Sequence, residues 1–99
     1  MIEKQPSPDS RHILVTFRLP GAPWAKRVNL VGDFNDWDTR ATPMEHDPED
    51  YTWHVTLELE AGREYQFRYL IDGEEWQNDW HADKYVPNIY GSENSVIVL

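Results

Sequence analysis

The stretch Tyr51-Thr-Trp-His-Val-Thr-Leu-Glu-Leu59 alternates apolar and polar side chains along its whole length. A period of two places successive side chains on opposite faces of an extended chain, so this pattern predicts a half-buried β-strand. The apolar face is expected to hold the odd-numbered residues: Tyr51, Trp53, Val55, Leu57 and Leu59.

The same alternation returns over Glu64 to Asp72, after a short link, Glu60 to Arg63, that contains Gly62. Arg68 is expected to point outward, and Leu70 is an apolar exception on that outward face. Two such runs joined by a short Gly-containing link predict a β-hairpin. The inward residues of the second run are Tyr65, Phe67, Tyr69 and Ile71.

Further strands are expected on both sides of this hairpin, over residues 11–19, 26–32, 75–77 and 94–99. Asp33 to Asp38 is rich in turn formers and is expected to be an ordered loop. Because no segment carries a long helical stripe, the sequence predicts an all-β sandwich of mostly antiparallel strands. Residues 1–10 are interpreted as a flexible tail, residues 11–99 as a single domain, and residues 78–91 as an irregular segment.

Composition narrows the classes of function. The 99 residues include 18 acidic and 9 basic side chains, no Cys and five Trp, with a net charge of −9. This charge repels phosphate backbones, so nucleic acid is not an expected partner. A membrane partner is not expected either, because no apolar run is long enough to span a bilayer. The first residues lack the features of a signal peptide, and we therefore expect a cytoplasmic protein.

No catalytic, metal or cofactor site is expected. The run that starts at Asp33 fails as a calcium loop because it has Trp37 at a ligand position and Met44 at the twelfth. No nucleophile-elbow motif is present. Neighbouring carboxylates such as Asp72 and Glu74 are interpreted as solvated surface, since a domain of this size has little mass for an enzyme cleft.

The five Trp differ in their surroundings. Trp53 lies on the inward face of a strand and is expected in the core. Trp37 lies in a loop of Asn and Asp, and Trp76 follows the Asp72-Gly73 turn at the start of the irregular stretch. An exposed indole at such a place offers a flat apolar face to a sugar ring. The alternative from the residues alone is that these indoles cap the sandwich or contact another protein. Trp24 has no assigned role.

Three blocks of the sequence resemble one known family. They are Val28 to Trp37 (VNLVGDFNDW), Tyr65 to Gly73 (YQFRYLIDG) with Trp76 after it, and Tyr90 to Val98 (YGSENSVIV). These blocks are similar to those of the isoamylase N-terminal, or early-set, domains, which form family 48 of the carbohydrate-binding modules. Members include glycogen-branching and debranching enzymes, the glycogen-binding domain of the AMP-activated protein kinase β subunit, and small prokaryotic stand-alone proteins.

The resemblance implies an immunoglobulin-like sandwich that binds α-1,4-glucan, such as glycogen, starch or a maltooligosaccharide, without catalysis. Carried over by position, it implies two stacking indoles, a basic group, an apolar loop residue and an amide, which fall on Trp37, Trp76, Arg68, Tyr90 and Asn94. Tyr90 stands where the family has an aliphatic residue, and its ring is expected to add a third stacking surface. Trp80 and Tyr85 are candidates to extend this site. The alternative is a protein-interaction or regulatory module with little sugar affinity, whose partner is a glucan-processing enzyme or a kinase-like protein.

Overall fold

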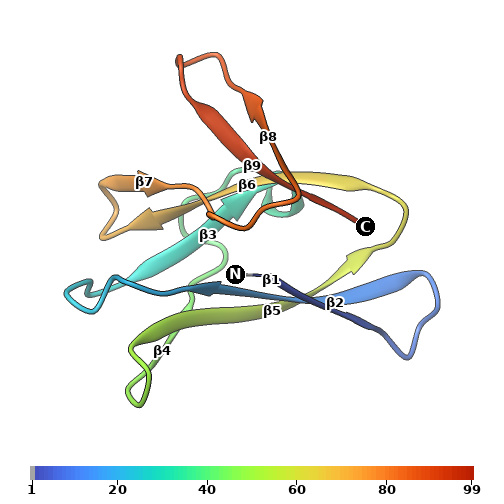
Figure 1. The fold of residues 1–99 in the computed structure, drawn as a ribbon, viewed down its shortest axis with the longest axis horizontal. Helices are drawn as coiled ribbons and strands as arrows, with labels where there is room; N and C mark the ends of the chain where they lie inside the picture. The colour runs from blue at the N-terminus through green and yellow to red at the C-terminus, as the bar shows by residue number, and fades with distance from the viewer. Residues whose placement is uncertain (1) are drawn as a thin grey trace.

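The computed structural model describes residues 2–99, which form two antiparallel sheets packed face to face (Figure 1). The first sheet has the order β1 (Ile2–Pro6), β2 (His12–Leu19), β5 (Thr52–Glu60) and β4 (Glu45–Asp47). The second has the order β3 (Val28–Gly32), β6 (Glu64–Ile71), β9 (Glu93–Val98) and β8 (Lys84–Pro87), with β7 (Glu75–Gln77) also paired to β6. A short 3₁₀ turn, η1 (Asp33–Asn35), follows β3. The predicted all-β, immunoglobulin-like sandwich is confirmed.

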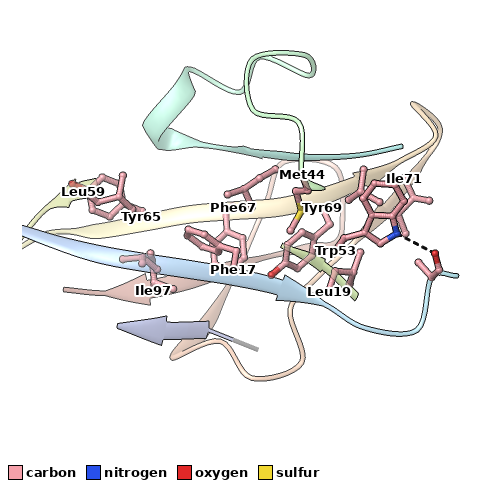
Figure 2. Packing of buried hydrophobic residues seen from close by; sticks show 14 residues of the cluster. Phe17, Leu19, Met44, Trp53, Leu59, Tyr65, Phe67, Tyr69, Ile71 and Ile97 are labelled. Atoms are coloured by element: carbon pink, nitrogen blue, oxygen red, sulfur yellow. Dashed lines mark hydrogen bonds between the residues drawn. The ribbon is translucent and has the colours of Figure 1, made fainter. Parts of the chain in front are cut away.

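The core lies between the sheets and is built around the inward faces of β5 and β6 (Figure 2). Trp53 is buried as predicted, and its indole N–H donates to the carbonyl oxygen of Ala22 at 3.1 Å. Phe67 of β6 meets Phe17 of β2 edge to face, with ring centroids 5.0 Å apart. Burial of large aromatic side chains from both sheets is the main force that holds the sandwich together.

Tyr51 departs from the predicted strand. Its φ of 59° is left-handed, it precedes β5, and its side chain is exposed instead of sharing the inward face of Trp53. Side chains alternate between faces only within the strand, and Tyr51 lies just before it. The alternation in the sequence therefore predicts a strand that is one residue too long at its start.

The prediction of a flexible tail over residues 1–10 is wrong for residues 2–6, which form β1 and pair with β2 from Ile2↔Phe17 to Pro6↔Ile13. Met1 lies outside the described residues. An edge strand gains backbone hydrogen bonds while most of its side chains stay in water, so no apolar period marks it. Lys4 fastens this strand to the other sheet, because its ammonium donates to Asp83 Oδ2 at 2.6 Å and to the Val98 carbonyl at 3.2 Å.

The irregular segment predicted over residues 78–91 contains β8, which pairs with β9 from Lys84↔Val96 to Pro87↔Glu93. The three-residue strand β4, which pairs with β5, also escaped prediction. Both strands are too short and too polar to show a period. The strand predicted from residue 26 begins at Val28.

Candidate functional site

The outer face of the second sheet carries a groove of about 980 Å³. The alternation of β6 turns Gln66 and Arg68 toward this face, away from the core. The five residues expected to bind sugar all line the groove, which places them together although they come from distant parts of the sequence. Its full lining is Trp37, Thr39, Gln66, Arg68, Trp76, Pro87, Asn88, Ile89, Tyr90 and Asn94.

Trp37 is held in place by the loop that follows η1. Asp36 and Trp37 both have left-handed backbone, with φ of 57° and 58°. The indole N–H of Trp37 donates to Asp33 Oδ1 at 3.0 Å, while Asp33 Oδ2 accepts the backbone N–H of Gln66 at 2.8 Å. Asp33 therefore fixes the orientation of the indole relative to β6, the strand that carries Arg68.

The turn into this loop depends on Gly32 and Asn35. The side chain of Asn35 accepts from the Gly32 N–H and donates to the Leu30 carbonyl, at 3.1 and 2.9 Å. Gly32 has extended backbone, which any residue adopts, but a Cβ there would lie 2.4 Å from the Gln66 carbonyl oxygen. Glycine is thus required because β6 passes so close to β3.

Arg68 and Trp76 form the middle of the groove. The guanidinium carbon of Arg68 lies 5.8 Å from the centroid of the Trp76 ring, within the range of a cation–π contact. The Nε atom of Arg68 is buried and has no hydrogen-bond partner among the described residues. Because this atom has almost no accessible surface, the donors that Arg68 can offer at the groove are the other N–H groups of its guanidinium.

Asn94 forms the floor of the groove rather than its wall, since it is only 8% exposed. Its Nδ2 donates to Gln66 Oε1 at 3.0 Å, and its Oδ1 accepts from Asn88 Nδ2 at 3.1 Å. Asn88 Oδ1 in turn accepts the backbone N–H groups of Tyr90 and Ser92. This chain of amides connects the sheet to the 88–92 loop and fixes the position of that loop beside the groove.

Tyr90 and Ile89 stand at the rim of the groove. They are 86% and 91% exposed, so their apolar surfaces face solvent. Gln66, Asn88, Thr39 and Ile89 were not among the predicted site residues. The alternation that predicts an outward side chain at Arg68 predicts one at Gln66 as well. No pattern in the sequence indicates that Asn88 lines the groove.

The two candidates for an extension of the site do not line the groove. Trp80 borders a separate hollow. Tyr85 pairs in register with Ser95 on the opposite face of the sheet, and its hydroxyl donates to the carbonyl of Asp79. Tyr85 thus supports the segment that carries Trp80 and makes no wall of its own.

The charge of the groove differs from that of the chain. Arg68 is the one charged residue in its lining, and the lining contains no carboxylate, although the chain has 18 acidic residues. Within residues 2–99 there is no group of three or more His, Cys, Asp or Glu placed to hold a metal ion. The same residues contain no helix long and apolar enough to cross a membrane.

Residues 13–86 match the family described as Carbohydrate-binding module 48 (isoamylase N-terminal domain). The chain belongs to this family. It is 43% identical over 54 residues to a 1,4-α-glucan branching enzyme of Rhizobium johnstonii, and 44% identical over 50 residues to one of Mesorhizobium japonicum. These segments cover 54% and 50% of this chain but only 7% of each enzyme.

Two solved structures of the enterobactin esterase of Shigella flexneri share the fold of this carbohydrate-binding module 48 chain. They match 99% of the chain with TM-scores of 0.77 and 0.78, and the chain covers 32% of each. The sequence identities are 13% and 14%, so this similarity concerns the fold alone. The same sandwich is therefore attached to enzymes of different chemistry.

Proposed function

We propose that the groove binds an α-1,4-glucan reversibly and without catalysis. Trp37 and Trp76 offer indole faces to the apolar faces of successive glucose rings, and Tyr90 forms a third wall. Arg68 donates to hydroxyl oxygens through its planar fork. Asn94 holds Gln66 and Asn88 in place, and these two amides present further hydrogen-bonding groups at the groove.

One observation supports this proposal most directly: three aromatic side chains and one cation lie along a groove that contains no carboxylate. A neutral sugar meets no repulsion there, and the guanidinium of Arg68 has further N–H groups to donate to sugar hydroxyl oxygens. The matched relatives are named as 1,4-α-glucan branching enzymes, which agrees with an α-glucan as the ligand.

The test is a titration of the ¹⁵N-labelled protein with maltoheptaose. We expect the Trp37 and Trp76 indole resonances and the Arg68 amide to shift at millimolar ligand. Trp37→Ala should weaken binding at least about fivefold, because one aromatic stack contributes about 1 kcal/mol or more.

Trp24→Ala is the matched control, since Trp24 is 56% exposed and does not line the groove. It should bind as the wild type does. A wild-type spectrum that stays unchanged at millimolar maltoheptaose contradicts the proposal.

Docking of another protein is the second candidate function, and the observation in its favour is Ile89. A fully exposed aliphatic side chain beside Tyr90 suits a protein surface as well as a sugar. Ile89→Ser separates the two: it should leave maltoheptaose affinity nearly unchanged if Trp37 and Trp76 bind the sugar. Docking is favoured if the wild type captures a glucan-processing enzyme, Ile89→Ser abolishes this capture, and maltoheptaose does not compete with it.

A further inference from the structure

A hollow of about 280 Å³ lies where β2 ends, apart from the groove. One of its walls is made by residues 77–81, which belong to the end of β7 and to the segment that follows it. Figure 1 shows this segment running from β7 toward β8 across the front of the sandwich. The hollow and the groove have no lining residue in common. The hollow is lined by Arg18, Leu19, Pro20, Gly21, Gln77, Asn78, Asp79, Trp80 and His81.

A third depression, of about 560 Å³, connects the two. It shares Asn78 with the hollow, and it shares Pro87 and Asn88 with the groove. The rest of its lining is Gly91, Ser92 and Glu93. The three concave surfaces therefore follow one another along the molecule, with two amides, a hydroxyl and the Glu93 carboxylate in the middle one.

Trp80 is the most exposed indole of the chain, at 87%. Within residues 2–99 its ring makes no hydrogen bond and no ring contact, so nothing in the fold explains its presence. It borders the hollow, whose other apolar surface comes from Leu19 and Pro20. An open indole face above a small apolar hollow suits the apolar face of a pyranose ring.

The charged residues of the hollow already have partners. Arg18 pairs with Glu3 at 2.8 Å. The carboxylate of Asp79 accepts the Tyr69 hydroxyl and the His81 backbone N–H, both at 2.7 Å. Because both charged groups already have hydrogen-bonding partners within the fold, neither needs a charged ligand, and the hollow suits an uncharged one.

The segment that carries Trp80 is anchored to β9. The Asp79 backbone N–H donates to Ser95 Oγ at 2.9 Å, Ser95 Oγ donates to Asn78 Oδ1, and Asn78 Nδ2 donates to the Glu93 carbonyl. Burial raises the pKa of Tyr69 far above its usual value, so the hydroxyl keeps the proton that it donates to Asp79. Because the backbone of this segment is held in place, it loses little conformational entropy when a ligand binds beside Trp80.

We propose that the hollow beside Trp80 is a second subsite for the glucan chain that occupies the groove. This proposal rests on the proposed function. A chain bound at Trp37 and Trp76 continues over the middle depression and places a further glucose unit against Trp80. Since the second contact is made by a ligand already held, affinity rises with chain length.

The experiment compares maltotriose with a longer linear amylose fraction, by calorimetry and by the indole N–H resonances of the ¹⁵N-labelled protein. Trp80→Ala should bind maltotriose within about twofold of the wild type, because maltotriose fits within the groove. The same variant should bind the longer amylose about tenfold more weakly, the loss expected of one aromatic stack. Trp24→Ala, the control for another exposed indole, should bind both ligands as the wild type does.

Each outcome supports or overturns the subsite. Trp80→Ala that binds long amylose as tightly as the wild type overturns it, even where shifts at Trp37 and Trp76 leave the proposed function intact. A Trp80 resonance that shifts with long amylose while the groove resonances stay fixed contradicts the proposed function, and it also overturns the assignment of the hollow as a second subsite for a chain held in the groove. Failure of every indole to shift with either ligand contradicts both proposals.

Discussion

Asp33 shows how one carboxylate prepares a binding surface without facing the groove itself. Its two oxygens accept the Trp37 indole N–H and the Gln66 backbone N–H. A bound sugar therefore meets an indole whose orientation is already fixed, and binding costs less conformational entropy than it would with a mobile loop. The acidic residue at position 33 therefore has a structural role in addition to turn formation, since it holds the Trp37 indole.

We predict that Asp33→Asn weakens maltoheptaose binding about threefold to tenfold, because hydrogen bonds to a charged acceptor are stronger than those to an amide. An Asn at this position also has an NH₂ group that cannot accept either donor. Calorimetric titration measures the change. Asp36→Asn, in the same loop and with no side-chain hydrogen bond among the described residues, should bind as the wild type does. Equal affinities of the two variants would show that Asp33 does not position Trp37.

At the scale of elements, β3 ends where β6 leaves no room for a side chain. Gly32 occupies this crossing, and its backbone conformation is accessible to every residue. Glycine is therefore required by the close contact with β6 and not by the backbone conformation. This contact holds the start of the Trp37 loop against the strand that carries Arg68.

Gly32→Ala should lower the free energy of unfolding by at least about 2 kcal/mol, since the new methyl meets a backbone oxygen that cannot move without disturbing the sheet. Urea denaturation measures this loss. Gly62→Ala is the comparison: its φ of 77° is strained for alanine, but nothing lies within 4 Å of the added Cβ. A smaller loss for Gly32→Ala than for Gly62→Ala would refute the contact argument.

Strands with one face in the core were predictable from sequence, whereas the edge strands β1, β4 and β8 were not. The β5–β6 hairpin alternates because burial selects apolar side chains on one face. β1 and β8 have mostly exposed side chains, and their stability comes from backbone hydrogen bonds to β2 and β9. Backbone groups are the same in every sequence, so such strands leave almost no signal.

At the scale of the whole molecule, the groove combines residues from four separate segments. The family resemblance placed Trp37, Arg68, Trp76, Tyr90 and Asn94, and the structure brings all of them to one surface. The network of Tyr69, Asp79 and Ser95 had no such guide. Its members are 10 and 16 residues apart, and a lone polar residue gives no sign that it is buried.

The distribution of charge predicts how binding responds to salt. The chain carries a net charge of −9, yet the groove has one cation and no carboxylate in its lining. Because a glucan is neutral, screening has little to act on. Maltoheptaose affinity should change by less than about twofold between about 50 and 500 mM NaCl. A decline of about tenfold would indicate that the ligand is charged, and calorimetry at both salt concentrations distinguishes the cases.

The reach of Lys4 to the Val98 carbonyl brings the opening and closing strands of the fold together. This contact ties the two sheets together at their first and last strands, and β1 contributes no residue to the groove. Replacing the residues of β1 that face solvent would therefore leave the lining of the groove unchanged.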